Sequence, residues 1–528
     1  MIITAVLETD LSVSGSTNLT IVAPSVSMTI SPTTANVPAG QTLQFSASVQ
    51  NSTANVIWQV NGLTGGDAAD GTITSTGAYT ATYSAPNVSS PLTVTVTAVL
   101  QVNPSLAASA GITVVPLDTL TGVYSWRNDN GLTGQNAQET HLTPASVSPT
   151  TFGKLFGCSV DGQIYAQPLY VANVAIPNLG PRNVVYVATE HDSVYAFDAD
   201  ASSCQIFWQT SFIDAVPASD IRGETDIVPE IGITGTPVID PNSATLYVVA
   251  KTKESGVYVQ RLHALDLTIG AEKFGGPATI QAVVNGSGDG SVAGTISFQS
   301  LSLTENQRSA LLLAGGKIYV AFDSYADTDP FPGWLFAYDA GNLQNLQTVP
   351  AVFNSTPNGS HGGIGESGAA PSSDVTRSPN VRGNVFVVTS DGKPFDPNTG
   401  SDYPETLLKL QINAAATGFT VASSFTPWNE ATLNLQKYFG STGVLLLDSA
   451  ASTVPLAIAG GEGGSLYLLS RDNLGGFNGP NGPDNVVQTL CLTADGNSGL
   501  PASILGTPAY WVNNNVPTVY VAAADDTL

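Results

Sequence analysis

Cysteine is scarce in this sequence. Three cysteines, Cys158, Cys204 and Cys491, occur in 528 residues, and no CxxC pair is present. Such an odd and sparse set excludes a multi-bridge disulfide framework. We therefore expect small, buried apolar side chains, with a single bridge as the alternative, whose partners the spacing leaves open.

Basic residues and long apolar runs are also scarce. Lys and Arg number 16 against 41 Asp and Glu, and the net charge is −25. So acidic a chain repels phosphate backbones and anionic membrane surfaces, which argues against nucleic acid as a partner. Solubility of a secreted protein accounts for this charge without a specific cationic partner. No run of about 18 apolar residues occurs, so no transmembrane helix is predicted.

The familiar catalytic motifs are missing as well. The sequence holds no GxSxG elbow and no HExxH helix, and its Gly-rich GGEGGS run at 460–465 lacks the GK[ST] of a phosphate loop. We interpret that run as a β-turn. Any catalysis by histidine would have to use His141, His191, His263 or His361.

The sequence is rich in glycine and proline and in short alternating runs. Gly 52, Pro 33 and frequent Val, Thr, Ser and Tyr suit strands joined by turns, and long helical periodicities are absent. The length exceeds what one hydrophobic core normally serves. We predict an all-β protein with two or more domains.

An internal repeat opens the chain. ITAVLETDLSVSGSTNLTIVAP (3–24) matches VTAVLQVNPSLAASAGITVVP (96–116). The second copy ends a unit of alternating strands over 25–116, in which Trp58 is the expected core aromatic of a β-sandwich. Residues 1–24 are therefore expected to be the last strands of a preceding sandwich domain. No signal peptide follows Met1, so an export signal is expected upstream of this sequence.

A second repeat fills the rest of the chain. Strand pairs such as NVVYVATEHDSVYAFDAD (183–200) and GKIYVAFDSYADTDPFPGWLFAYDA (316–340) recur six times, and each follows a strand with small residues. Such units cannot bury both faces alone, and radial stacking into a β-propeller solves this. We expect a linker at 117–150 and a propeller over 151–528. The sixth unit stops at Leu528, so its blade is expected to be incomplete.

Several motifs carry a family resemblance. AGQTLQFSASV and VIWQVNG resemble bacterial immunoglobulin-like domains; PEIGITGTPVIDP, ENQRSALLLAGGKIYVAF, HGGIGESGAAP and LYLLSRDNLGGF resemble secreted β-propellers with pyrroloquinoline-quinone (PQQ)-like repeats, the quinoprotein alcohol dehydrogenase-like fold. The resemblance implies seven or eight blades in the complete protein. It implies little about activity, because a shared fold does not transfer chemistry.

Quinoprotein dehydrogenases of this family hold the quinone between a Trp face and a vicinal disulfide, with Ca²⁺ beside it. This sequence has no adjacent cysteines, and only QIFWQTSF around Trp208 resembles the family's Trp docking motif. We therefore predict no cofactor. A PQQ- and Ca²⁺-dependent oxidoreductase acting on alcohols or sugars is the alternative.

Six charged residues lie where loops near a propeller axis are expected. ATEHDS, the Gly-rich SHGGIGESG loop, PEIG and ENQR supply them, and turn stabilisation or charge pairing between blades is the structural alternative. The ligand-binding candidates are Glu190, His191, Glu230, Arg308, His361 and Glu366.

Two loops carry alternating oxygen ligands that suit Ca²⁺. DPNTGSD offers Asp396, Asn398 and Asp402, and DSYADTD offers Asp323, Asp327 and Asp329. Neither loop has the Gly and distal Glu of the twelve-residue EF-hand pattern, so both are weak candidates.

Together these patterns predict a secreted, cell-surface or periplasmic bacterial protein without a catalytic constellation. An immunoglobulin-like stalk would present a propeller that binds a ligand, glycan or protein. The alternatives are the quinone-dependent oxidoreductase and a hydrolase or lyase that uses Glu and His at the propeller's funnel.

Overall fold

The chain is an all-β protein, with 46% strand and 4% helix. The computed structural model describes residues 2–524 apart from 19, 21–23, 39–41, 87, 89–91, 116–120, 137–141, 143–145, 213, 344–349, 376, 378–382, 396–399, 437, 449–453, 493–501 and 514–515. Two compact units follow each other in the sequence, Met1–Thr119 and Leu120–Leu528. No helix in the part that the structure describes is long and apolar enough to cross a membrane.

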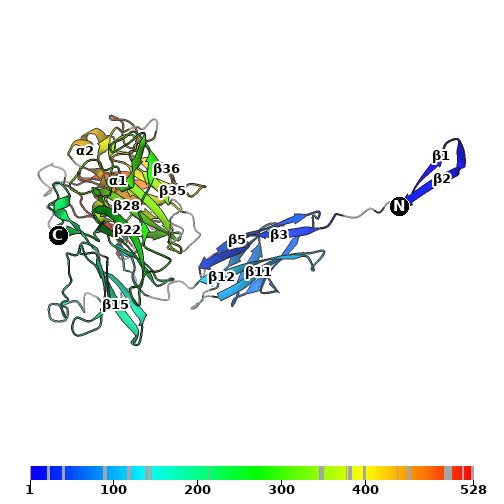
Figure 1. Ribbon diagram of the computed structural model, residues 1–528, viewed down its shortest axis with the longest axis horizontal. Coiled ribbons are helices and arrows are strands. Elements are labelled where there is room, and N and C mark those ends of the chain that lie inside the picture. Colours follow the sequence, from blue (N-terminus) through cyan, green and yellow to red (C-terminus); the bar gives the residue numbers. More distant parts are fainter. Residues whose placement is uncertain are drawn as a thin grey trace. The chain divides into compact units, whose positions relative to one another are not determined.

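The first unit contains a two-sheet sandwich (Figure 1). Its strands alternate between buried and exposed residues, as strand β6 does over Val56–Val60. Trp58 is 3% exposed and packs against Phe45 with ring centroids 6.2 Å apart, so the expected core aromatic is confirmed. One sheet has the order β3 (Ser27–Ser31), β5 (Thr42–Gln50), β10 (Thr80–Ser84), β9 (Gly71–Ser75) and β8 (Gly66–Asp67). The other has the order β4 (Thr34–Pro38), β12 (Ala107–Val115), β11 (Leu92–Leu100), β6 and β7 (Leu63–Thr64).

The two copies of the opening repeat form the same structure. The first copy is an antiparallel hairpin of β1 (Ile2–Leu7) and β2 (Asp10–Asn18), and the second is the β11–β12 hairpin of the sandwich. The β11–β12 hairpin buries one face in the core, whereas every residue of β1 and β2 is exposed.

The second unit contains six antiparallel sheets in chain order, which we number sheet 1 to sheet 6. Sheets 1 to 5 each have four or five strands and sheet 6 has two. Sheet 1 consists of β13 (Gly122–Val123), β14 (Leu169–Ile176), β15 (Gly180–Ala188), β16 (Ser193–Asp198) and β17 (Ile206–Ser211). Sheet 2 consists of β20 (Val238–Asp240), β21 (Thr245–Glu254), β22 (Val257–Asp266) and β23 (Ala278–Thr279). Sheet 3 consists of β26 (Glu305–Asn306), β27 (Leu312–Ala314), β28 (Lys317–Ser324), β29 (Trp334–Asp339) and β30 (Ala351–Asn354).

The remaining sheets continue the same meander. Sheet 4 consists of β32 (Ser372–Ser373), β33 (Val385–Val388), β35 (Leu407–Ile412) and β36 (Phe419–Phe425). Sheet 5 consists of β37 (Leu445–Leu447), β38 (Leu456–Gly460), β39 (Ser465–Ser470) and β40 (Gln488–Cys491), and sheet 6 of β41 (Ala509–Asn513) and β42 (Val516–Tyr520). Short ribbons lie between them: β18 (Val216–Pro217) with β19 (Glu230–Ile231), β24 (Val283–Asn285) with β25 (Thr295–Ser297), and β31 (Ser360–His361) with β34 (Gly392–Lys393). The helical turns are η1 (Ala218–Asp220), α1 (Phe298–Leu301), η3 (Glu366–Gly368), α2 (Glu430–Gln436) and η4 (Phe439–Ser441).

Each sheet packs against the sheets before and after it in the sequence. In β21, Leu246 and Val248 lie in the core shared with sheet 1, whereas Tyr247 and Val249 lie in the core shared with sheet 3. Further cores join sheets 3 and 4, sheets 4 and 5, and sheets 5 and 6. The period-two alternation of these apolar strands therefore serves two interfaces at once.

A short stretch before sheet 1 hydrogen-bonds to the other sheets, and we call it the inner segment (residues 124–135). Its Tyr124 carbonyl oxygen accepts from the Ile239 amide of sheet 2 at 2.7 Å, and its Gly131 carbonyl oxygen from the Leu446 amide of sheet 5 at 2.8 Å. The Asn130 side-chain amide donates to the carbonyl oxygens of Leu313 in sheet 3 and Val375 next to sheet 4, both at 2.9 Å. In sheet 6, the Tyr510 amide donates to the Thr133 carbonyl oxygen at 2.9 Å.

The described residues do not form a closed propeller. What the structure shows is a row of face-packed sheets whose first strands are joined by the inner segment. A complete ring of blades is taken up as a proposal below.

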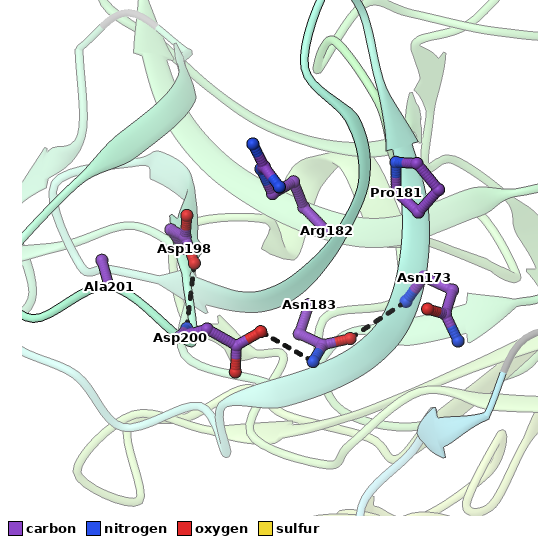
Figure 2. Close-up of a pocket in the computed structure, with 7 residues that line it drawn as sticks. All are labelled: Asn173, Pro181, Arg182, Asn183, Asp198, Asp200 and Ala201. Atoms are coloured by element: carbon purple, nitrogen blue, oxygen red, sulfur yellow. Dashed lines mark hydrogen bonds between the residues drawn. The ribbon is translucent and has the colours of Figure 1, made fainter.

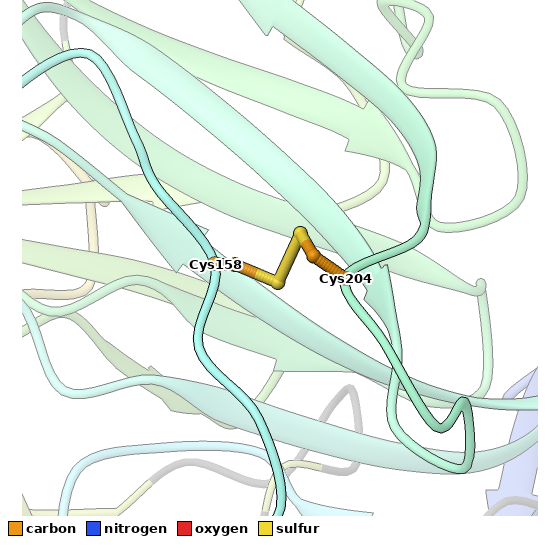
Figure 3. The surroundings of a disulfide bond; sticks show 2 residues. All are labelled: Cys158 and Cys204. Atoms are coloured by element: carbon orange, nitrogen blue, oxygen red, sulfur yellow. A yellow bond between two sulfur atoms is a disulfide. The ribbon is translucent and has the colours of Figure 1, made fainter.

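Our preference for unpaired cysteines is wrong for two of the three. Cys158 and Cys204 form a disulfide, with Cα atoms 5.2 Å apart, across 46 positions of sequence (Figure 3). The bridge ties the segment before sheet 1 to the loop that follows β16. Cys491 is unpaired and exposed.

Candidate functional site

Charged side chains recur at one position of the sheets, four residues after the aromatic marker of the second strand. Counting from Tyr186, Tyr247, Tyr319 and Phe386, this position holds Glu190, Lys251, Asp323 and Ser390. The markers pair with the first strand in equivalent registers, so these residues occupy the same end of successive sheets. We call the charged groups gathered there the acidic end.

Glu190 is 1% exposed and is held by sheet 2. Its Oε2 accepts hydrogen bonds from the Gly232 amide at 2.8 Å and the Thr234 hydroxyl at 3.1 Å, whereas its Oε1 has no partner. Burial raises the pKa of Glu190 to about 7, and the attraction of Arg308 opposes this rise. One carboxylate oxygen of a nearly fully buried side chain is thus left to accept a hydrogen bond.

His191 and Asp192 extend this part of the acidic end. His191 Nδ1 lies 2.7 Å from Glu230 Oε1, a contact that raises the pKa of the half-exposed histidine. Burial raises the pKa of Asp192 well above its ordinary value, and neither of its carboxyl oxygens has a hydrogen-bond partner. A neutral, protonated Asp192 is therefore favoured at this position.

Lys251 is the buried cation of sheet 2. Its Nζ donates to the carbonyl oxygens of Leu303 at 2.7 Å and Glu305 at 3.1 Å and lies 4.2 Å from the ring centroid of Tyr325. Burial lowers the pKa of Lys251 to about 7, while the carboxyl groups of Glu305 and Glu190 oppose this. Burial raises the pKa of Glu305 well above its ordinary value, and neither of its carboxyl oxygens has a hydrogen-bond partner.

The Gly-rich loop 361–368 gives room to charged groups of sheet 3. A Cβ atom at Gly363 or Gly365 would overlap the Asp323 carboxyl group, and one at Gly368 would overlap the Arg308 guanidinium. Glu366 in the same loop accepts from the Val388 amide at 2.9 Å through Oε1, whereas Oε2 has no partner. The glycines of this motif are needed because side chains from another sheet fill the space.

His361 opens the loop between two carboxylates. Its Nε2 lies 2.7 Å from Asp329 Oδ1 and its Nδ1 lies 3.1 Å from Asp391 Oδ2, and its ring stacks on Phe331. The hydrogen bond to Asp391, followed by the contact with Asp329, raises the pKa of His361. Burial raises the pKa of the neighbouring Asp323 to about 7.

The six residues expected from the sequence thus fall into three neighbourhoods of one region. Glu190, Glu230, His191 and Arg308 interact directly or electrostatically, Arg308 packs on Gly368 next to Glu366, and Asp323 links the same loop to His361. Their role as ligand-binding residues stays a prediction. The sequence analysis overlooked Lys251, Asp192 and Glu305; the position four residues after each aromatic marker was the signal for Lys251.

Other candidates fare differently. Asp396 and Asn398 of the expected Ca²⁺ loop lie outside the described residues, as does His141. Asp402 is 2% exposed, and its Oδ1 accepts from the Asn358 amide at 2.8 Å. His263 is buried and stacks on Phe212, the packed role expected for it. Within the described ranges no group of three or more His, Cys, Asp or Glu side chains is placed to hold a metal ion.

No protein family and no curated protein matches the chain. The chain is weakly similar to three solved structures. The N-terminal eight Ig domains of the Down syndrome cell adhesion molecule align at 11% identity over 65% of this chain and 56% of that one, with a TM-score of 0.14. Surface layer protein SbsC, domains 4–9, gives 10% identity over 87% and 72%, with a TM-score of 0.15. The ICAM-5 D1–D4 ectodomain fragment gives 11% identity over 95% and 99%, with a TM-score of 0.15.

The chain spans 56% of the adhesion-molecule structure. At such TM-scores these likenesses carry no argument about fold or function. The class of protein therefore rests on the strand pairing described above, which defines an all-β chain with a sandwich followed by face-packed antiparallel sheets.

Proposed function

We propose that this chain is an extracellular or cell-surface binding protein, in which an immunoglobulin-like sandwich serves as a spacer and the six sheets are blades of a β-propeller. The observation that carries the propeller is the inner segment. Twelve consecutive residues reach five successive sheets by hydrogen bonds, and β13, immediately before them, belongs to sheet 1. A segment this short can do so when the first strands of all the sheets surround one axis.

The acidic end is then the binding face of that propeller. Glu190, Glu305 and Glu366 keep carboxyl oxygens without partners although each residue is 2% exposed or less. Leaving buried acceptors unpaired costs free energy, about 1–3 kcal/mol each, and functional sites are where proteins retain such groups. The ligand favoured by this arrangement presents N–H or O–H donors, as amines and polyols do.

The test uses the full chain and a panel of soluble amines, oligosaccharides and peptides, followed by differential scanning calorimetry. A ligand of the acidic end should raise the melting temperature of the sheet unit and leave that of the sandwich unchanged, by linkage. Substitution E190Q or R308A should weaken its binding about tenfold. D448N, at a side chain that is 83% exposed in sheet 5's β37–β38 turn, is the control and should bind normally.

A ligand that stabilises the sandwich instead, or that binds E190Q and R308A as tightly as the unaltered chain, would contradict this function. The quinone-dependent alternative is tested separately by adding PQQ and Ca²⁺ to the full chain and measuring dye reduction with alcohols and sugars. In the family that the sequence resembles, a disulfide of adjacent cysteines contacts the quinone; the disulfide found here joins cysteines 46 positions apart.

A further inference from the structure

Sheet 1 carries a polar pocket at the opposite end from Glu190 and Asp192 (Figure 2). The pocket has a volume of about 420 Å³, within the range of roughly 300–1,000 Å³ found for small-molecule sites. Strand β16 begins after Asp192 and ends at Asp198, so its six residues separate the pocket from the acidic end. At about 3.3 Å per residue that distance is roughly 20 Å, and the two places cannot share one small ligand.

A hydrogen-bonded chain of planar polar groups forms one wall of the pocket. The Asn173 amide donates to Asn183 Oδ1 at 3.1 Å, Asn183 Nδ2 donates to Asp200 Oδ2 at 2.8 Å, and the Asp200 amide donates to Asp198 Oδ1 at 2.9 Å. Figure 2 shows these side chains in one row, with Arg182 facing the same hollow. The row fixes each amide and carboxylate group before any ligand arrives.

Two groups in the pocket keep hydrogen-bonding capacity. Asp198 is 9% exposed, and its Oδ1 is occupied by the Asp200 amide while Oδ2 has no hydrogen bond within the part of the chain that the structure describes. Across the same residues, the exposed Arg182 guanidinium has no hydrogen-bond or ion-pair partner. The pocket therefore offers an acceptor and a multi-proton donor to one ligand.

The balance of charge selects the ligand class. Two carboxylates oppose a phosphate or carboxylate ligand, and the guanidinium next to them opposes a metal cation. A neutral ligand with several hydroxyl groups satisfies both, because its O–H groups donate to the carboxylates and its oxygens accept from Arg182 and the amides. The Pro181 ring and the Ala201 methyl group supply apolar contact for the C–H face of such a ligand.

Comparison with the next sheets shows that this pocket is particular to sheet 1. Asp339 ends β29 as Asp198 ends β16, and its Oδ1 accepts from the Gly341 amide at 2.9 Å, so the carboxylate-capped turn recurs. What sheet 1 adds is Asn173, placed by a break in the β14–β15 register between Val171 and Val174. The Cys158–Cys204 disulfide follows Asp200 by four residues and holds the loop that carries it.

We propose that this pocket is a binding site for a neutral saccharide, independent of the acidic end. The test measures binding of glucose, galactose, mannose and N-acetylglucosamine, and of the corresponding soluble polysaccharides, to the full chain by saturation-transfer NMR and calorimetry. At least one sugar should bind. Polysaccharide binding without free-sugar binding would place the ligand in a chain; both count as support when they depend on Arg182 and Asp198.

The variants separate this pocket from its surroundings. R182Q removes an exposed donor that has no partner to lose, and D198N keeps the capping oxygen, so both should fold normally while binding falls about tenfold. D339N, the matched change in sheet 3, and E190Q at the acidic end should bind sugar as the unaltered chain does. Sugar binding that survives both R182Q and D198N would overturn the proposal, and so would the absence of any binding or preferential binding of inorganic phosphate or Ca²⁺ at these residues. Loss of the acidic-end function in E190Q with sugar binding retained would show that the two proposals stand or fall separately.

Discussion

The sandwich and the sheet unit bury different kinds of residue. The first 116 residues contain no Lys, Arg or His. In the described part of the sandwich every buried residue is apolar, whereas the sheet unit buries Glu190, Asp192, Lys251, Glu305 and Glu366. Both units use the same period-two strands, so the difference does not come from the strand geometry.

This difference separates a unit held by packing alone from one that also keeps charge inside. Taking a carboxyl group or an ammonium group out of water costs free energy unless it is fully paired. The sandwich avoids that cost. The sheet unit bears it at one end, where its sheets present equivalent positions, and this agrees with a binding role for the sheets and a spacing role for the sandwich.

The largest expected effect comes from emptying one core while leaving the other intact. Phe336 is fully buried between sheets 2 and 3 and meets Phe298 edge-on at 5.1 Å; Phe45 is 2% exposed in the sandwich. F336A should destabilise the sheet unit by about 3–5 kcal/mol and F45A the sandwich by a similar amount. Calorimetry should show two transitions, each moved by one substitution. A single transition moved by both would mean that the units unfold together.

A smaller effect is expected at the inner segment, which has no counterpart in the sandwich. N130A removes two hydrogen bonds, to the Leu313 and Val375 carbonyl oxygens, and should lower the stability of the sheet unit by about 2 kcal/mol. Amide hydrogen exchange should rise in both β27 and β32, although they belong to different sheets. Faster exchange confined to one of them would contradict the joining role of the segment.

The strands of both units could be predicted from the sequence, because local alternation and aromatic markers such as Tyr186 and Tyr247 depend on neighbouring residues. Trp58 and the Glu190–His191 turn were within reach for the same reason. The inner segment was not, because its contacts are distant: Arg127 donates to Pro508 across 381 positions. The burial of Lys251 and Glu305 and the Cys158–Cys204 pairing also depend on sheets that come together only in the folded chain.

A third effect should appear as a stabilisation that only the sheet unit can show. Burial raises the pKa of Glu366 well above its ordinary value of 4.5, so its contribution to stability is complete below pH 4.5 and is lost as the pH rises through the folded-state pKa. E366Q keeps the Oε1 acceptor for the Val388 amide and carries no charge. The variant should be about 1–2 kcal/mol more stable than the unaltered chain at pH 8 and nearly equal to it at pH 4.5. Melting curves across this range test it, and a variant that is destabilised at pH 8 would contradict it.

The smallest effect concerns His361, whose ring lies between Asp391 and Asp329 with Asp323 and Asp327 nearby. Its raised pKa means that the protonated ring stabilises the fold below about pH 6.5 and that this contribution disappears as the pH rises through the folded-state pKa. H361N, which suits the left-handed backbone at this position (φ 59°), should lower stability at pH 6 by less than about 1 kcal/mol and have less effect at pH 9.

H191N is the matched control for His361, because His191 has a single carboxylate partner and a side chain that is 51% exposed, against 28% for His361. Its effect at pH 6 should therefore be smaller still. Urea unfolding of both variants and the unaltered chain at pH 6 and pH 9 gives the comparison. The sandwich transition, which involves no histidine, should stay the same in all three proteins. A pH-dependent change in that transition, or a larger loss in H191N than in H361N, would show that the charges around His361 do not act as their geometry indicates.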